Sequence, residues 1–262
     1  TVNRRPFPAF GPIQEVLNVV NSNYNAMNFK VTQRFSKGLT FLAAYTWAKA
    51  IDNGSGIRTN SGDTLWPTNS YALNNERGLS QFNVARRLVA SFVYELPFGH
   101  GKPFATSGPA AAILGGWQLG GILTFADGTP INGTQLGDTA SLGNLGNQMN
   151  ATGISPIPSD RSAQHYWNAA AFDWTSSNLT WQTGNLGRNT LFTPGRANAD
   201  ASLARTVRLF ENHALNFRFE AFNATNHPNW NAPPTDPRSS TFGIITTAKT
   251  MRQLQFAMKY TF

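Results

Sequence analysis

The chain has 262 residues and a net charge of +8, yet only 13% of its residues are charged, against about 25% in a typical soluble domain. It lacks cysteine, which excludes disulfides, cysteine-bound metals and a thiol nucleophile. It also lacks an apolar run of about 18 residues, which excludes a transmembrane helix. With 12% aromatic residues, 23 glycines and 15 prolines, the composition predicts an all-β protein rich in turns.

Seven segments alternate large apolar residues with polar or small ones. This period of two places the two sets on opposite faces of a β-strand. In the first segment, Phe29 and Val31 point to one face and Lys30 and Thr32 to the other. The predicted strands, in chain order, are residues 25–36, 39–50, 87–96, 117–127, 197–209, 213–224 and 251–262.

The last segment shows this alternation most clearly. Its apolar set is Leu254, Phe256, Met258, Tyr260 and Phe262, and the residues between them are polar or small. A strand in a soluble protein has about 5–6 residues, whereas a tilted membrane-spanning strand needs about 9–11. The length of this segment therefore predicts a transmembrane strand.

Charged residues in mid-strand and the lengths of the connections support the same interpretation. Arg218 and Glu220 would be costly in a packed core, but they can face water inside a wide barrel. Short turns at one rim and long loops at the other are typical of outer-membrane barrels. The short turns are at 37–38 and 211–212, and the long segments are at about 51–83, 128–195 and 225–250. The connection 97–116 departs from this pattern, because it is long for the turn side.

The fold class predicted is therefore all-β, an antiparallel transmembrane β-barrel. Counting strands back from a periplasmic Phe262 places the start of residues 25–36 at the outer rim. Because bacterial barrels have an even number of strands and begin in the periplasm, we expect residues 1–262 to be an incomplete C-terminal part of one larger barrel domain. The sheet should then be open, with strands 25–36 and 251–262 lying apart. Direct pairing of these two strands would instead indicate a complete small barrel.

Several short phrases together resemble the barrel of TonB-dependent outer-membrane receptors, in particular the Oar-like branch. They cover nearly the whole chain, and their combination is specific. The phrases are Asn21–Ala26, Arg34–Leu39, Tyr45–Asp52, Arg87–Phe92, Leu114–Leu119, Gly184–Asn189, Glu220–Pro228 and Gln255–Phe262.

This resemblance implies a barrel of about 22 strands in the bacterial outer membrane, with an N-terminal plug and a TonB-contacting segment that are absent here. The implied function is uptake of a scarce, bulky, unidentified solute, for which this chain supplies barrel wall and extracellular loops. The implied partners are outer-membrane lipid and lipopolysaccharide, TonB through the missing plug, and the barrel-assembly machinery. That machinery would recognise the aromatic C-terminal end, which contains Phe256, Met258, Tyr260 and Phe262.

Two sets of residues are candidates for contact with a solute. The charged residues predicted to face the lumen carry more basic than acidic groups, which suggests an anionic solute, or lipopolysaccharide phosphates near the outer rim. They include Lys30, Arg34, Arg208, Arg218, Glu220 and Lys259. The aromatic residues in predicted loops include Trp66, Tyr71, Trp167, Trp174, Trp181 and Trp230. These aromatics can grip a sugar or peptide face, or they can pack a long loop onto itself.

No pattern in the sequence indicates an enzyme, a metal site or a cofactor site. The four histidines share no i, i+2 or i, i+4 spacing, and residues 97–103 lack the spacing of a phosphate-binding loop. Nothing in the sequence places a histidine near Ser91 to act as a base. The acidic turns 52–55 and 127–130 lack further calcium ligands.

The sequence also bears on nucleic-acid binding and on adhesion. The basic residues form no run and accompany no zinc or RNA-recognition motif, so we expect no nucleic-acid partner. The alternative to transport is an adhesin or glycan-binding β protein, membrane-anchored or secreted, that uses the same loops without import.

Overall fold

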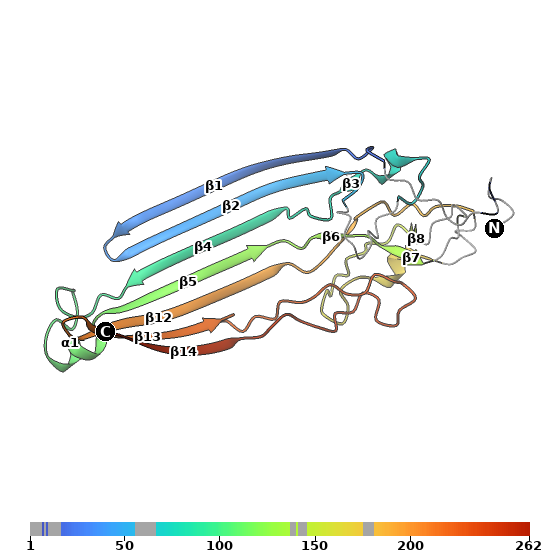
Figure 1. The fold of residues 1–262 in the computed structure, drawn as a ribbon. Coiled ribbons are helices and arrows are strands. Elements are labelled where there is room, and N and C mark those ends of the chain that lie inside the picture. The colour runs from blue at the N-terminus through green and yellow to red at the C-terminus, as the bar shows by residue number, and fades with distance from the viewer. Residues whose placement is uncertain are drawn as a thin grey trace.

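The computed structural model describes residues 7, 9, 17–55, 67–136, 140, 146–174 and 181–262. Its main body is a single eight-stranded sheet in the order β1-β2-β4-β5-β12-β13-β14, with the short β3 (Gly78–Leu79) paired to β2 (Figure 1). The long strands are β1 (Ser22–Ser36), β2 (Leu39–Asp52), β4 (Arg86–Glu95), β5 (Trp117–Ala126), β12 (Arg196–Phe210), β13 (His213–Phe222) and β14 (Gln253–Thr261). All seven strands that the alternation predicts are present.

The strand register keeps the two kinds of side chain on opposite faces across the whole sheet. One cross-strand row runs through Leu39, Tyr94, Leu119, Leu203, Phe219 and Phe256. The adjacent row runs through Thr40, Val93, Gly120, Ser202, Glu220 and Gln255. Since neighbouring residues of a strand point to opposite faces, the sheet has one apolar face and one largely polar face.

Tight turns with positive backbone φ angles join two pairs of strands. Lys37 and Gly38, with φ angles of 51° and 84°, connect β1 to β2, and Glu211, with φ 37°, begins the connection from β12 to β13. A Cβ added at Gly38 would lie 3.1 Å from the carbonyl oxygen of Glu95. Glycine therefore meets two requirements at this position, a left-handed backbone and a close approach to β4.

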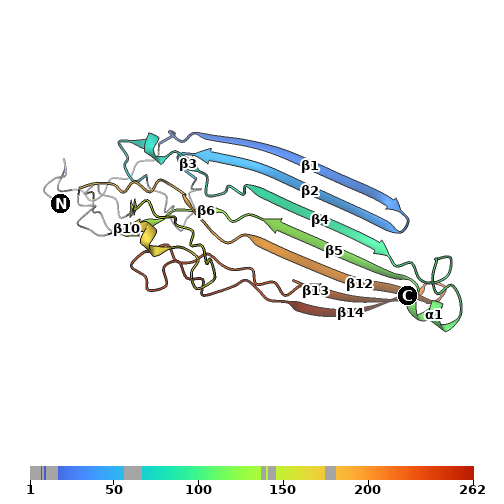
Figure 2. The same ribbon diagram turned by 180° about the vertical axis from the view of Figure 1, so that it is seen from behind.

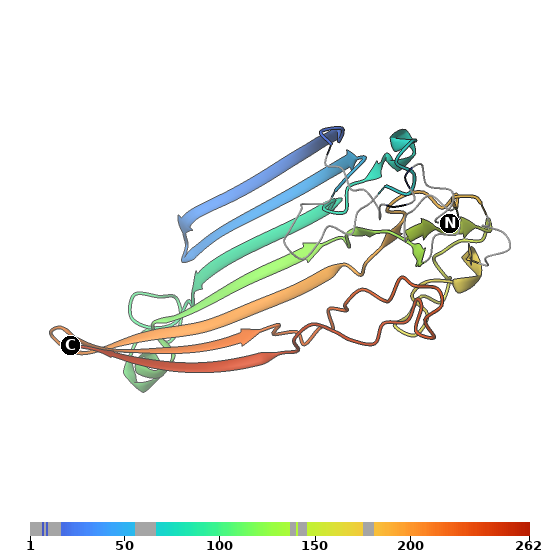
Figure 3. The same cartoon turned by 45° about the vertical axis from the view of Figure 1, so that its right-hand side comes forward.

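The sheet is open, as the sequence predicts. β1 pairs along its length with β2 and β14 with β13, so the two strands lie at opposite edges of the sheet (Figure 3). The alternative of a small closed barrel, in which these two strands pair directly, is therefore wrong.

The two ends of the sheet differ in their connections. The end that carries the turns 37–38 and 211–212, here called the turn rim, also carries residues 96–116 and the helix α1 (Gly108–Leu114). The opposite end, here called the loop rim, carries the described parts of residues 53–85, 127–195 and 223–252 (Figure 2). No helix among the described residues is long and apolar enough to span a membrane.

The long segments at the loop rim, which the sequence predicts to be loops, contain short strands and turns of helix. They pair as small two-stranded sheets, β10 with β9, β11 with β6 and β7 with β8. Strands of two or three residues are too short to produce a visible alternation, which explains why the sequence does not reveal them. The elements are η2 (Leu73–Glu76), β6 (Pro130–Ile131), β7 (Thr134–Leu136), β8 (Gly146–Gln148), β9 (Asn150–Ala151), η3 (Ala169–Ala171), β10 (Phe172–Asp173) and β11 (Leu191–Phe192).

The main hydrophobic cluster of the described residues lies at the loop rim rather than in the sheet. Phe172 and Phe242 meet edge to face at 5.5 Å between ring centroids, and Trp167 lies 5.9 Å from Phe242. The buried members are Met149, Tyr166, Trp167, Ala171, Phe172, Leu191, Phe242 and Ile245. A single sheet layer cannot enclose a core by itself, so its apolar face must be covered by something outside the described chain.

The register generates a test of which face meets lipid. Changing Phe256 to Arg places a charge on the apolar face, where exposure to lipid near the membrane centre costs about 2–4 kcal/mol. We expect this variant of the natural protein to fail in membrane assembly, whereas Gln255→Arg, one residue away on the polar face, should assemble normally. Membrane fractionation and heat-modifiability on gels measure both, and equal damage at the two positions would contradict the assignment of faces.

Candidate functional site

The polar face of the sheet carries charged residues whose acids are all engaged. Glu95 binds Lys102 at 2.9 Å, and Glu220 binds Arg218 at 2.7 Å, each between nitrogen and carboxylate oxygen. The carboxylate of Asp200 accepts hydrogen bonds from the Asn198 side chain and the Asn223 backbone, both at 2.8 Å.

Several basic side chains on the same face have no such partner. Within the described part of the chain, no carboxylate forms an ion pair with Lys30, Arg208 or Lys259, and all three are exposed. The register places Lys30 opposite Ala44, Arg208 opposite Ala214 and Lys259 opposite Asn216, each on the polar face of the sheet. A β-bulge between Gln33 and Ser36 leaves Arg34 without a cross-strand partner, so the register does not fix its facing.

Sequence reasoning missed two further arginines of the polar face. Arg87 and Arg196 lie opposite Ala126 from its two sides, near the loop rim, and both are exposed. Two strand spacings separate their backbones, which is about 10 Å, and the small Ala126 leaves the space between them open. Their position at the first residues of strands hid them, because the alternation is weakest there.

Arg86, which precedes Arg87 in the chain, differs from it in having an acidic partner. Arg86 belongs to the apolar face, opposite Trp47, and its guanidinium binds both carboxylate oxygens of Asp127 at 2.8 and 3.0 Å. Asp127 is one of the two turn acids that lack the further ligands a calcium ion would need. The other, Asp52, is also occupied by an arginine.

That arginine, Arg188, ties two loop-rim connections together in a buried cluster. It binds Asp52 at 2.7 Å with both side chains almost fully buried, and it also donates to the Glu76 carbonyl at 3.1 Å and to Ser55 Oγ. A Cβ at Gly78 would lie 2.7 Å from the Arg188 carbonyl oxygen, so only glycine allows this approach. A buried pair of this kind is stable when its remaining donors are satisfied, and here both terminal nitrogens of Arg188 donate hydrogen bonds.

Asparagine side chains end several strands at the loop rim. Asn83 Oδ1 accepts the Ala50 N–H at 2.7 Å, and Asn229 Oδ1 accepts the Ala197 N–H at 2.8 Å. Next to Arg188, the side chain of Asn189 donates to the Leu79 carbonyl at 2.7 Å. These bonds satisfy backbone groups where the strand ladder stops.

Titratable groups of the loop rim belong mostly to local pairs. The hydrogen bond from His165 holds the pKa of Asp160 below its usual range, and that from Arg238 does the same for the pKa of Asp236. Burial raises the pKa of the Tyr166 phenol, over whose ring the Arg161 guanidinium lies at 3.8 Å. These contacts stabilise the loops locally.

The structure separates the predicted loop aromatics into two groups. Trp167 is 3% exposed, and Trp174 and Trp230 pack against the same hydrophobic cluster, so these three pack the loops onto themselves. Tyr71 and Trp181 are 94% and 57% exposed. Trp66 lies outside the described residues. Burial thus removes Trp167 from the residues that could touch a solute.

Trp181 borders a polar hollow of about 400 Å³. Asn69, Gln182 and Thr183 also line it, and the Tyr71 N–H donates to Asn69 Oδ1 at 2.9 Å, so both exposed aromatics lie at this hollow or next to it. An aromatic ring beside amide and hydroxyl groups is a surface that can bind a polar ligand with an apolar face.

The remaining candidates do not come together. No group of three or more His, Asp and Glu side chains within the described residues could hold a metal ion. His213 hydrogen-bonds Tyr260 at the turn rim, while His165 lies at the loop rim. The cross-strand neighbours of Ser91 are Leu42 and Ile122. Phe256, Met258 and Tyr260 occupy the apolar face of β14, and Phe262 follows it, 87% exposed.

The Arg188 cluster generates a test of loop-rim stability. Changing Arg188 to Ala leaves the Asp52 carboxylate buried without its partner, which costs about 3–5 kcal/mol. We expect faster limited proteolysis of the loops in the folded natural protein. The control is Arg238→Ala, whose pair with Asp236 is largely exposed and therefore contributes little to stability. Equal proteolysis rates for the two variants would show that the cluster does not hold the loops.

Comparison with known proteins agrees with this architecture. A family model described as outer membrane beta barrel domain matches residues 1–255. No curated protein and no solved structure gives a match. The family match covers nearly the whole sequence, and the single open antiparallel sheet with one apolar face fits it. The chain therefore belongs to the outer membrane β-barrel domain family, whose members reside in the bacterial outer membrane.

Proposed function

We propose that this chain forms part of the wall and the extracellular loops of a TonB-dependent transporter that takes up a bulky anionic solute. The observation that carries the proposal is the polar face, which is continuous across seven long strands and bears exposed basic side chains with no acidic partner among the described residues. Such a face suits a wide, water-filled lumen.

The open edges support a barrel larger than these strands. In a bilayer, each unpaired backbone group costs several kcal/mol, so membrane-spanning sheets close on themselves. β1 and β14 each leave one side unpaired within the described sheet. We infer that further strands of the same barrel pair with both edges, and that the closed barrel is wide enough to need a plug.

The arginines near the loop rim support an anionic solute. Arg87 and Arg196 flank Ala126 on the polar face, where a solute entering from outside would first meet the wall. A guanidinium binds carboxylate, sulfate or phosphate groups with two parallel hydrogen bonds. Two such groups about 10 Å apart suit a solute that carries more than one anionic group.

One observation favours the adhesin alternative. The exposed Tyr71 and Trp181 lie beside a polar hollow on a loop assembly with its own hydrophobic core. A rigid, aromatic extracellular surface serves ligand capture whether or not import follows. Dependence on TonB separates the two functions.

Transport predicts a physical contact with TonB. We expect the natural full-length protein, purified in detergent, to bind the periplasmic domain of TonB in a calorimetric titration. Deleting the segment that precedes its plug should abolish the binding and leave the barrel folded. A full-length protein that shows no binding, while cells without TonB still adhere to surfaces through it, would favour the adhesin.

If the solute is anionic, removing positive charge from the polar face should weaken its binding, whereas removing positive charge from the apolar face should not. We expect Arg87→Gln combined with Arg196→Gln to weaken binding of a small polysulfonated dye to the full-length protein about a hundredfold or more, since each arginine loses a charge-assisted hydrogen bond that contributes about 1.5–3 kcal/mol. The control, Arg86→Gln, removes one positive charge from the opposite face and should leave binding unchanged. Fluorescence anisotropy at low and high salt measures both, and an equal loss in the control would contradict a lumenal site.

A further inference from the structure

The connection between β4 and β5, residues 96–116, is much longer than the other two connections of the turn rim. It contains the helix α1 (Gly108–Leu114), and residues 103–116 carry no charged side chain. Its first part turns toward the polar face, where Lys102 binds Glu95 at 2.9 Å. Nothing in barrel closure requires the helical part that follows.

Contacts with the wall place the end of α1 at the apolar face. Arg205 lies opposite Trp117 and Phe217 in an apolar row of the sheet. Its guanidinium donates to the Ile113 carbonyl at 2.8 Å and to the Ala112 carbonyl. The Trp117 indole N–H also donates to the Ile113 carbonyl, at 3.0 Å.

These contacts explain why an arginine occurs on an apolar face. The last carbonyls of a helix lack partners within the helix and carry partial negative charge. Arg205 satisfies two of them and lies over the Trp117 ring at 5.7 Å. A charged side chain on the lipid face costs far less near the membrane interface than at the membrane centre, so this position at the rim tolerates it.

The outer surface of the segment is apolar and uncovered. Ile113 is 65% exposed, Leu114 47% and Phe104 58%, whereas Ala111 is buried. At the same rim, Tyr94, Trp117 and Tyr260 form a belt of aromatic residues on the apolar face. Such belts mark the interface between lipid headgroups and acyl chains.

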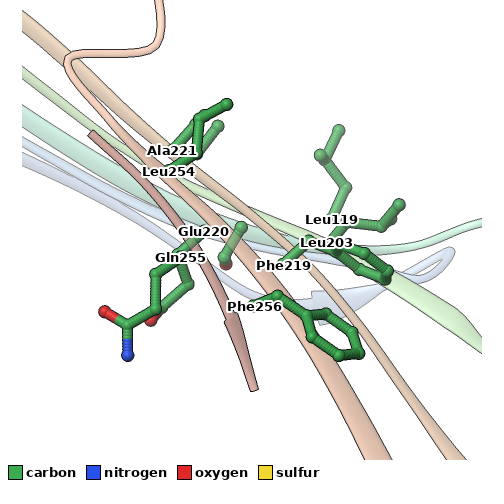
Figure 4. A pocket seen from close by; sticks show the side chains of 10 residues that line it. Leu119, Leu203, Phe219, Glu220, Ala221, Leu254, Gln255 and Phe256 are labelled. Carbon is green, nitrogen blue, oxygen red and sulfur yellow. The ribbon is translucent and has the colours of Figure 1, made fainter. Parts of the chain in front are cut away.

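The apolar face next to this segment also offers room for an acyl chain. Leu119, Leu203 and Phe219, one row nearer the membrane centre than Arg205, border a shallow hollow of about 370 Å³ in which Ala201 and Ala221 provide the space. Figure 4 shows Phe219 and Phe256 side by side at this hollow, with Gln255 pointing away from them. The lining is almost entirely apolar.

We propose that residues 104–114 form a membrane-anchoring segment that inserts into the periplasmic leaflet of the outer membrane. Ile113 and Leu114 enter the boundary between phospholipid headgroups and acyl chains, and Arg205 holds the helix against the wall from the lipid side. The surface is continuous with the lipid-facing wall and carries no charge, so its occupant is phospholipid. An amphipathic or apolar helix at this depth gains binding free energy in proportion to its buried apolar area.

The test uses the natural full-length protein in vesicles of phosphatidylethanolamine and phosphatidylglycerol. An environment-sensitive fluorophore is attached through Ile113→Cys, and, as a control on the same connection, through His100→Cys, which is exposed next to Lys102. We expect a label at position 113 to be quenched severalfold more than one at position 100 by phospholipid spin-labelled near its headgroup. Arg205→Gln should release the helix and remove most of this difference, and Arg205→Lys should remove part of it.

Three outcomes would overturn the proposal or its part that concerns Arg205. A label at position 113 that is quenched by aqueous iodide rather than by spin-labelled lipid would show a solvent-exposed loop. A label shielded from both quenchers would show that a protein, such as a second copy of this chain, covers the segment. If Arg205→Gln leaves lipid quenching at position 113 unchanged, Arg205 does not hold the membrane-anchoring segment against the wall.

Discussion

A single layer of sheet has no partner layer to pack against, so the pairing between neighbouring strands must hold the wall together. Each strand of the main sheet exchanges backbone hydrogen bonds with its neighbours in an antiparallel register that keeps side-chain rows intact from β2 to β14. A shift of one residue between any two strands would move polar side chains to the apolar face. The apolar face, the polar face and the placement of every charge follow from that register.

The charges of the wall illustrate this dependence. Arg86 and Arg87 are adjacent in the chain but point to opposite faces. The first binds Asp127 through two hydrogen bonds, while the second lies across Ala126 from Arg196 with no acid between them. Arg205, a second arginine of the apolar face, donates to helix carbonyls at the turn rim. Arg86 and Arg205 thus have fixed partners, whereas the arginines of the polar face include groups with no acidic partner among the described residues.

The loops of the loop rim form a folded unit that is stabilised differently from the wall. A hydrophobic cluster around Trp167 and Phe242 and the buried Arg188–Asp52 pair hold segments together that are far apart in the chain. Because Arg188 binds the last residue of β2, the loop unit is anchored on the wall itself. A packed surface at the loop rim results, and Tyr71 and Trp181 remain exposed on it.

The amino-acid sequence by itself determined the seven long strands and their two faces, because alternation is a local property that each strand displays along its own length. It also predicted an open sheet, since counting strands back from a periplasmic Phe262 placed the start of the first strand at the outer rim. The open edges of the sheet agree with this.

Only the tertiary structure decided which loop aromatics are buried, which arginines have hydrogen-bonding partners and where the long connection 96–116 lies. Trp167 and Trp181 are alike in sequence, yet one is in a core and the other is exposed. Arg188 meets Asp52 across 136 positions, and Arg205 meets Ile113 across 92. Contacts between residues so far apart leave no periodic trace in the sequence, because they depend on how the strands bring distant segments to the same rim.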